Sequence, residues 1–247
     1  MNLESIKHLW ERFQQTSSSL KSSMVIIFVL IILVLSLGSY FKKRDPMEKP
    51  TGLGVLVEFY VDWINSMCKE LLGSRWKRYA PFIGTLGIVI FISNISGLVG
   101  LTPPTANLFV TLGIGLLAGF HFHFIGIRHN GLKNYIKTTY MEPSPIMSPL
   151  NVISELLTPI SLSLRLFGNI LSGSVIMALL YNAILGIVGG LSPILGIAVT
   201  GVVAPAFHAI FDIFFGAIQT FVFMLLTTVF ISSKLPDEED DKLENKN

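Results

Sequence analysis

The stretch 143–233 most constrains what this chain can fold into, because it is apolar almost throughout. Its ionisable side chains are few: Glu155, Arg165, His208 and Asp212, with Tyr181 as a further titratable group. An isolated guanidinium at membrane depth costs roughly 2.5–3.5 kcal/mol on insertion scales. A chain that retains Arg165 in such surroundings therefore gives it either a permanent partner or a task.

The composition as a whole indicates a polytopic membrane protein. Apolar residues make up 51% of the 247 residues and charged residues 14%, whereas an average soluble chain is about 25% charged. The mean hydropathy is +0.64. Cys68 is the single cysteine, which excludes an internal disulfide and a metal site built on thiolates. The basic residues form no stripe with aromatics and no cofactor motif is recognisable, so we expect no nucleic-acid partner and no cofactor.

The first predicted span follows a polar segment at residues 1–23. Residues 24–41 are almost wholly apolar, and the basic cluster 42–44 comes directly after them. The positive-inside rule therefore places 42–44 in the cytoplasm and residues 1–23 outside. A cleaved signal peptide is the competing interpretation, but the apolar run is long and no small-residue cleavage site follows it.

The region 24–145 is predicted to hold three spans and one interfacial helix. The second and third spans are expected at 81–101 and 107–127, joined by an uncharged, proline-rich turn. Residues 52–73 have the pattern of an amphipathic helix that lies at the membrane surface, and a short cytoplasmic domain is the alternative. Basic residues follow the third span, again on the cytoplasmic side: Arg128, Lys133 and Lys137.

The region 146–233 is predicted to form a long helical hairpin. Hydropathy alone leaves two interpretations of its halves, 150–190 and 192–233. Each half is either two spans with a tight turn or one inclined helix, because about forty helical residues are roughly 60 Å long and the hydrocarbon core is about 30 Å thick. The glycine-rich stretch 186–192 marks the turn between the halves. The acidic tail 234–247 is expected to be a solvated cytoplasmic end.

The sparse polar residues of the hairpin fall on two helix faces. Arg165 and Asn169 are i, i+4 and share one face. On the last segment a second stripe holds His208, Asp212 and Gln219. Such intramembrane groups usually face a bundle interior or a water-filled cavity and mark ion pathways. In the competing, structural interpretation Arg165 pairs permanently with Asp212, and the two amides hydrogen-bond neighbouring helices.

Three further kinds of polar residue need an assignment. Glu155 lies roughly 15 Å along a helix from Arg165, too far to pair with it, and is expected at the mouth of an ion path. Ser174 is either a small packing residue or a polar group on that path. His121 and His123 stand in an aromatic run and are expected to anchor the chain at the membrane interface.

The run Pro-Ile-Ser-Leu-Ser-Leu-Arg-Leu-Phe-Gly-Asn at 159–169 resembles the signature of subunit a of the F-type ATP synthases. The stretches 104–112 and 210–228 are similar to that family's third span and last helix, and the resemblance covers 25–233. It implies an all-α integral membrane fold with about five membrane helices plus an interfacial helix. The last two membrane helices would form a long tilted hairpin, which selects the inclined-helix interpretation.

The resemblance implies a non-catalytic stator subunit of the ATP synthase membrane sector. Such a subunit provides two proton half-channels beside a rotating ring of c subunits, and ATP chemistry takes place elsewhere in the complex. Arg165 matches the family's essential arginine, which faces the ring carboxylates, while Asn169 and Gln219 match its polar neighbours. The implied partners are the c-subunit ring, the b-subunit peripheral stalk, other ATP synthase subunits and lipid. The expected location is a bacterial plasma membrane, with an organelle inner membrane as the alternative.

The sequence departs from the family pattern at three positions. Many bacterial relatives carry a carboxylate at the position of Ser174 and a histidine at that of Asp212. The acid is therefore expected to have moved between the two helices, with Ser174 and Asp212 adjacent in the hairpin. Asp212 is then expected on the outer proton path. His208 lies near the outer end of its segment and is either a further group of that path or a residue that caps the helix or snorkels to the interface. Asn107 stands where relatives often have aspartate.

Three other classes of protein remain alternatives. A secondary transporter would predict internal repeats, and none is recognisable between the halves. A membrane-embedded enzyme would need clustered histidines or carboxylates at metal-ligand spacing, and only His121 and His123 come near that pattern. A scaffold would hold Arg165 and Asp212 in a permanent buried ion pair.

Overall fold

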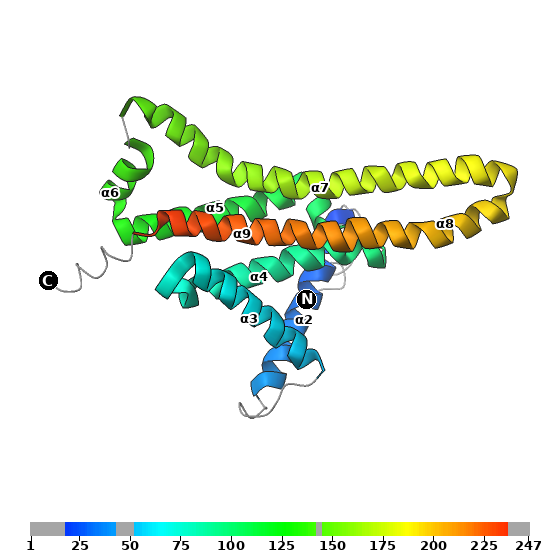
Figure 1. The fold of residues 1–247 in the computed structure, drawn as a ribbon, viewed down its shortest axis with the longest axis horizontal. Helices are drawn as coiled ribbons and strands as arrows, with labels where there is room; N and C mark the ends of the chain where they lie inside the picture. The colour runs from blue at the N-terminus through cyan, green and yellow to red at the C-terminus, as the bar shows by residue number, and fades with distance from the viewer. Residues whose placement is uncertain (1–17, 43–51, 142–144, 237–247) are drawn as a thin grey trace, which may run out of the picture. The chain divides into compact units, whose positions relative to one another are not determined.

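The structure, a computed structural model, describes residues 18–42, 52–141 and 145–236, and these are helical almost throughout, with no strand (Figure 1). The long helices are α2 (Ser18–Lys42), α3 (Leu53–Leu72), α4 (Trp76–Ile95), α5 (Leu108–Asn130), α7 (Ser148–Leu191), α8 (Pro193–His208) and α9 (Gly216–Lys234). The short elements are α6 (Leu132–Ile136), the 3-10 turns η1 (Gly73–Arg75), η2 (Ser96–Val99), η3 (Pro104–Ala106) and η5 (Pro145–Met147), and the π-helices η4 (Lys137–Met141) and η6 (Ala209–Phe215). The predicted outer segment 1–23, the basic cluster 42–44 and the acidic tail lie largely outside the described residues.

Within the described ranges, four helical segments are long and apolar enough to cross a membrane. They are Gly54–Val99, Leu108–Asn130, Ser148–Leu191 and Pro193–Lys234, and a shorter apolar helix, Lys21–Ile32, lies within α2. The expected all-α membrane fold is therefore confirmed. Four of the five predicted spans lie within these segments, and the first, 24–41, overlaps α2 and its shorter apolar helix.

Each half of the hairpin is one long helical segment. α7 is a single helix of 44 residues, and Pro193–Lys234 is helical over 42 residues. At 1.5 Å per residue α7 is roughly 66 Å long, about twice the hydrocarbon thickness. The predicted extent of the turn, 186–192, was wrong, because the helix continues to Leu191 and only Ser192 is extended, at φ −157°. The glycines instead allow a close crossing, since a Cβ at Gly196 would lie 2.7 Å from the Cα of Gly189.

The chain divides into two compact units. The first unit comprises 1–49, 89–110 and 167–218, and so contains α2, the end of α4, the η2–η3 turn, the later part of α7, α8 and η6. The second unit comprises 50–88, 111–166 and 219–247, and so contains α3, most of α4 and α5, α6, the first part of α7 and most of α9.

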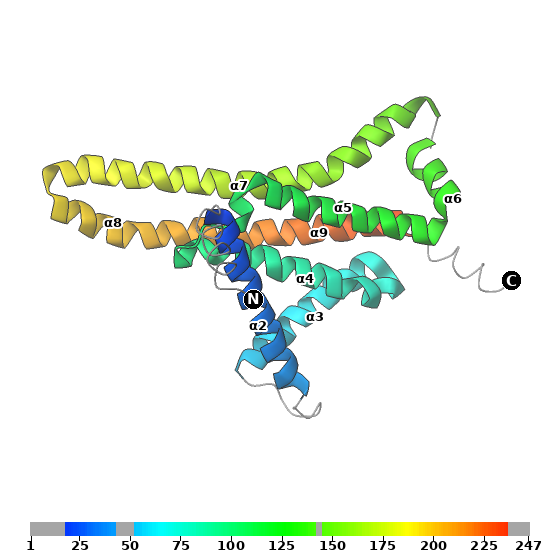
Figure 2. The same cartoon turned by 180° about the vertical axis from the view of Figure 1, so that it is seen from behind.

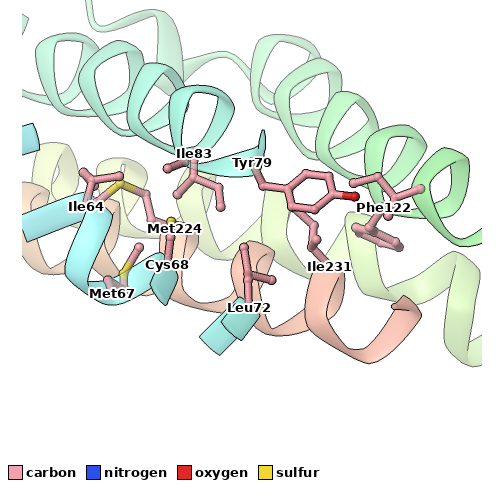
Figure 3. Packing of buried hydrophobic residues seen from close by; sticks show 11 residues of the cluster. Ile64, Met67, Cys68, Leu72, Tyr79, Ile83, Phe122, Met224 and Ile231 are labelled. Carbon is pink, nitrogen blue, oxygen red and sulfur yellow. The ribbon is translucent and has the colours of Figure 1, made fainter. Parts of the chain in front are cut away.

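In the second unit α3 folds back along α4 after Gly73, whose φ of +57° is readily adopted by glycine. One face of α3 is buried at helical spacing, and the hydroxyl of Tyr60 donates to the Gly84 carbonyl at 2.6 Å. The core joins four helices (Figure 3): Ile64, Met67, Cys68 and Leu72 of α3, Tyr79, Ala80 and Ile83 of α4, Phe122 and Ile125 of α5, and Met224 and Ile231 of α9. A helix at 52–73 is therefore present, and its position at the membrane surface stays a prediction.

Glycines bring α5 against the first part of α7. A Cβ at Gly119 would lie 2.8 Å from the Cβ of Pro159, and one at Gly115 would lie 2.6 Å from the Pro159 carbonyl oxygen. Because lipid tails are as apolar as leucine, helices in a membrane associate largely through close packing at such small residues. This contact fixes the position of the α7 turn that precedes Arg165.

In the first unit the later part of α7 runs antiparallel to α8, as both views show (Figures 1 and 2). At the end of α4, Asn94 is 1% exposed. Its Nδ2 donates to the Gly216 carbonyl at 3.2 Å, and its Oδ1 accepts a hydrogen bond from Thr105 at 3.1 Å. One buried amide therefore ties the η2–η3 turn to the end of η6.

Candidate functional site

Arg165 lies on α7 beside a hollow of about 390 Å³ in the second unit. Leu162, Ser163 and Leu166 around it are buried, whereas Arg165 itself is exposed. Among the described residues of its unit, no carboxylate forms an ion pair with Arg165. The guanidinium is therefore presented at the surface without a counter-ion from its own unit.

A stripe of hydroxyl groups leads along the same hollow to Arg165. Ser154, Thr158 and Ser161 precede it at the spacing i, i+4, i+7, i+11, so all four side chains share one face of α7. The rest of the lining is apolar: Leu150, Ile153, Leu157, Leu162, Leu226 and Phe230. Hydroxyls in an otherwise apolar wall give water molecules hydrogen-bonding partners. Sequence reasoning missed Ser154 and Thr158, although their helical spacing from Arg165 was a readable signal.

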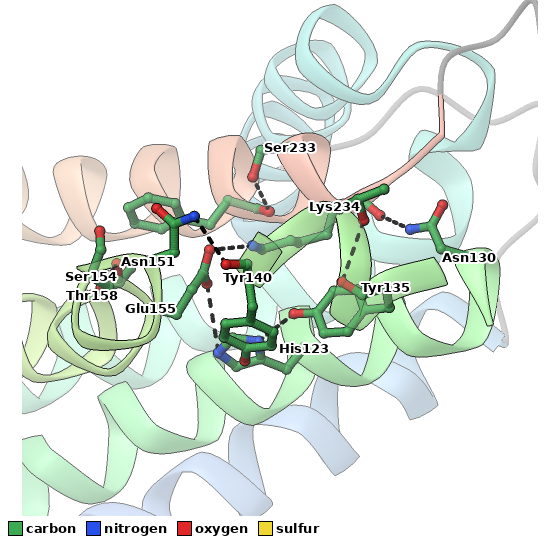
Figure 4. A network of polar contacts seen from close by, with 12 residues as sticks. His123, Asn130, Tyr135, Tyr140, Asn151, Ser154, Glu155, Thr158, Ser233 and Lys234 are labelled. Atoms are coloured by element: carbon green, nitrogen blue, oxygen red, sulfur yellow. Dashed lines mark hydrogen bonds and ion pairs between the residues drawn. The ribbon is translucent and has the colours of Figure 1, made fainter. Parts of the chain in front are cut away.

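Glu155, the predicted mouth group, belongs to a polar cluster at the start of α7 (Figure 4). Its Oε1 lies 2.5 Å from Nζ of Lys234 on α9, and its Oε2 lies 3.9 Å from Nε2 of His123 on α5. The side chains of Lys234 and Glu155 are 10% and 22% exposed. Lys234 was not expected from the sequence as the partner of Glu155, because 79 residues separate them.

His123 connects this cluster to α6. Its Nδ1 lies 2.5 Å from the hydroxyl of Tyr135, whose ring centre lies 5.8 Å from Nζ of Lys234. Burial raises the pKa of Tyr135 to about 12, and the nearby Tyr140 and Glu155 add to that effect. His123 is thus hydrogen-bonded within a side-chain cluster, which the expected role of an interfacial anchor did not include.

In the first unit His208 bridges Tyr181 and Asp212. The Tyr181 hydroxyl lies 2.9 Å from Nε2 of His208, and Nδ1 of His208 lies 2.6 Å from Oδ2 of Asp212. His208 ends α8, and Asp212 lies in the π-helix η6, a type of segment that is frequent at functional sites. Tyr181 was recognisable as the only tyrosine of the hairpin, but its partner depends on the helix register.

The two predicted amides have different surroundings. Asn169 donates from Nδ2 to the carbonyl of Phe215 at 3.4 Å, across the hairpin of the first unit. Gln219, in the second unit, is 8% exposed. Its Nε2 is buried and has no hydrogen-bond partner in the described part of the chain.

Ser174 bonds to its own helix, donating to the carbonyl of Leu171 at 2.8 Å. Its neighbour Gly173 lies opposite Phe211, since a Cβ at Gly173 would be 3.7 Å from the Phe211 Cβ. That register is compatible with adjacent Ser174 and Asp212. No hydrogen bond joins the two side chains among the described residues, so their pairing stays a prediction.

Long apolar helices that carry isolated, hydrogen-bonded ionisable groups define an integral membrane protein with polar sites inside its helical hairpin. Across residues 18–42, 52–141 and 145–236, no three His, Cys, Asp or Glu side chains gather closely enough to hold a metal ion. The family model described as ATP synthase A chain matches residues 22–232, and the chain belongs to this family.

Individual relatives agree with this assignment over most of the chain. It is 36% identical to ATP synthase subunit a from Aquifex aeolicus (strain VF5) over 221 residues, which are 87% of this chain and 97% of the relative. It is 32% identical to the protein of the same name from Sulfurihydrogenibium sp. (strain YO3AOP1), over 89% of this chain and 100% of the relative. It is also 32% identical to ATP synthase subunit a, sodium ion specific, from Propionigenium modestum, over 86% of this chain and 73% of the relative. The chain is therefore a membrane subunit that works together with other ATP synthase subunits.

Proposed function

We propose that this chain is the stator subunit of an ATP synthase membrane sector, where it provides two proton half-channels and the arginine that couples ion flow to rotation of a c-subunit ring. The main support for this proposal is that Arg165 is exposed beside a hydroxyl-lined hollow and has no carboxylate partner among the described residues of its own unit. A guanidinium at membrane depth is stabilised when a carboxylate faces it. A carboxylate on a neighbouring protein would supply that stabilisation.

The coupling follows from electrostatics. A ring carboxylate that has lost its proton carries a charge that lipid cannot solvate. Beside Arg165 this charge is compensated, so the carboxylate releases its proton on one side of the arginine and must be reprotonated on the other. The fixed positive charge also blocks direct passage of protons between the half-channels. Each proton that crosses 100 mV delivers about 2.3 kcal/mol to this rotation.

The inner half-channel, in this proposal, is the hollow that runs along the first part of α7 to Arg165. Ser154, Thr158 and Ser161 line it with hydroxyl groups, and Glu155 stands near its mouth. Basic residues precede α7 in the chain, and the positive-inside rule therefore assigns this end to the cytoplasm.

The outer half-channel is assigned to the later part of the hairpin. Asp212 is its titratable carboxylate, and His208 is hydrogen-bonded to it at 2.6 Å. Asn169 and Ser174 extend the polar path along α7, and Gln219 contributes a buried amide beyond η6.

The proposed partners cover surface that the chain leaves apolar. Only 6% of the most apolar 18-residue stretch of α7 is buried within this chain, so most of that surface needs a protein or lipid neighbour. We assign the α7 surface near Arg165 to the c-subunit ring and the remaining contacts to lipid and the b-subunit stalk. The proposed location is the plasma membrane of a bacterium.

Replacement of Arg165 by alanine tests the proposal. We expect the Arg165→Ala complex to assemble and to retain its ring, but to make no ATP when a proton gradient is imposed across vesicles that carry it. Arg128→Ala is the matched control, because Arg128 is also exposed but lies at the end of α5. Normal coupled synthesis in the Arg165→Ala complex would refute the proposal.

A further inference from the structure

We propose that Tyr181, His208 and Asp212 form a three-membered proton relay that feeds the outer half-channel, with Tyr181 as its outermost member. This inference rests on the proposed function, because it specifies how a proton reaches Asp212. The register of the hairpin gives the order of the groups. Asn169 lies opposite Phe215, Gly173 lies opposite Phe211, and Tyr181 reaches His208, closer to the turn at Ser192.

The three side chains form an unbroken hydrogen-bonded chain. One imidazole uses both of its ring nitrogens, Nε2 toward Tyr181 at 2.9 Å and Nδ1 toward Asp212 at 2.6 Å. The groups come from α7, α8 and η6, so the chain crosses the hairpin. The side chains of His208 and Asp212 are 31% and 22% exposed, which leaves them accessible to water in a channel.

Tyr181 differs from the other hydroxyl residues of α7 in what it contacts. Thr158, Ser163, Ser172 and Ser174 each donate to a backbone carbonyl three or four residues earlier in α7. Such local bonds satisfy a hydroxyl group without involving another element. Tyr181 instead reaches a titratable side chain 27 residues away. The Tyr181 hydroxyl is therefore bonded across the hairpin to a side chain that can accept a proton.

Each cycle of the relay moves one proton from water to Asp212. When Asp212 is ionised, it accepts a hydrogen bond from Nδ1–H of His208. Nε2 then carries the lone pair and accepts a hydrogen bond from the Tyr181 hydroxyl. A proton taken up from water at the Tyr181 oxygen drives the hydroxyl proton to Nε2, and the Nδ1 proton moves to Oδ2 of Asp212. Asp212 is then neutral and His208 has exchanged tautomers. After Asp212 has delivered its proton, the His208 ring, which is 31% exposed, loses its Nε2 proton to water and gains one from water at Nδ1, and this restores the starting tautomer. Rotation of the phenol hydroxyl then re-forms its hydrogen bond to Nε2.

The chemistry of the three relay side chains also determines which ion they can pass on. A phenol, an imidazole and a carboxyl group can each give up one proton and accept another. A hard cation prefers several oxygen ligands, and the central member here offers only nitrogen. The relay therefore conducts protons and not sodium ions.

Tyr181→Phe is the direct test, because it removes only the hydroxyl. Proton transfer by a positioned side chain contributes on the order of 10²–10⁴-fold to a rate, so we expect ATP synthesis driven by a proton gradient to fall at least tenfold in the assembled complex. Tyr60→Phe is the matched control: its hydroxyl donates to a backbone carbonyl at 2.6 Å, and synthesis should be unchanged. Adding His208→Ala to Tyr181→Phe should lower the rate no further than His208→Ala alone, because relay members act as a unit.

A second variant separates a relay from a packing role. Tyr181→His keeps an exchangeable proton at the position and should retain clearly more synthesis than Tyr181→Phe. Equal loss in the two variants, or multiplicative losses with His208→Ala, would overturn the relay. Wild-type synthesis in an assembled Tyr181→Phe complex, while Arg165→Ala remains inactive, would overturn the relay and leave the proposed function standing. Coupled synthesis in Arg165→Ala would instead overturn the proposed function.

Discussion

Lys234→Met should loosen the end of α9 by leaving Glu155 without its counter-ion. The two side chains are 10% and 22% exposed and their charged atoms lie 2.5 Å apart. Two unit charges at that distance attract by about 7 kcal/mol at an effective dielectric constant of about 20, and desolvation offsets much of this. Removal of one partner from such a pair costs about 3–5 kcal/mol. Because water reaches part of Glu155, we expect the lower end of that range.

The assay is amide hydrogen exchange at the last turn of α9 in the purified complex. A loss of about 3 kcal/mol in local opening free energy corresponds to exchange that is on the order of 10²-fold faster. Lys133→Met is the matched control, since Lys133 is exposed on α6. The double variant Lys234→Met with Glu155→Gln should recover most of the protection, because no charge is then left unpaired. Unchanged exchange in Lys234→Met, or no recovery in the double variant, would show that the ion pair with Glu155 does not hold the end of α9.

Three further predictions concern packing, the proton path and pH. Gly119→Leu should lower the yield of assembled complex, because overpacking against α7 costs about 1–3 kcal/mol. Gly113→Leu should leave the yield unchanged, because a side chain at Gly113 would enter open space. Asp212→Asn should reduce proton-driven ATP synthesis far more than Ser174→Ala, and equal small effects would count against a moved acid. The fold keeps Tyr135 neutral by raising its pKa from 10.0 to about 12, so an unfolded chain ionises first and stability falls as pH rises through that interval. Thermal unfolding of Tyr135→Phe should show a smaller fall over the same range, and an identical fall would contradict the assignment.

The helices could be predicted from apolar length because a segment in lipid must satisfy its backbone internally. Pro159 and Pro205 nevertheless stay inside helices, because neighbouring groups in a membrane protein can satisfy the backbone carbonyls that a proline leaves free. The glycine-rich stretch before Ser192 was predicted as part of the turn, since glycine marks both turns and close helix crossings. Apolar composition does not distinguish these two uses, and the crossing at Gly189 and Gly196 is visible only in three dimensions.

The partners of the polar residues were beyond sequence reasoning. Arg165, His208 and Asp212 stand out as rare ionisable residues in apolar sequence, so their importance could be recognised. Their contacts depend on helix register, and α8 is apolar on all its faces, so periodicity does not indicate which side meets α7. The bond from Tyr181 to His208 therefore emerged only from the fold. The same holds for the ion pair in the second unit, whose members are 79 residues apart.

The proposed coupling requires the face of α7 that carries Arg165 to lie against a ring of small subunits. The most direct measurement is cross-linking in the purified complex, with a photoreactive group attached at Ser161→Cys, one turn before Arg165 on the exposed face. Ser163→Cys is the control, because Ser163 is fully buried against α5. We expect the ring to co-purify and only the Ser161→Cys probe to form a covalent product with a ring subunit. A complex that contains the ring but gives no such product, or gives it equally from both positions, would show that this face of α7 does not lie against the ring.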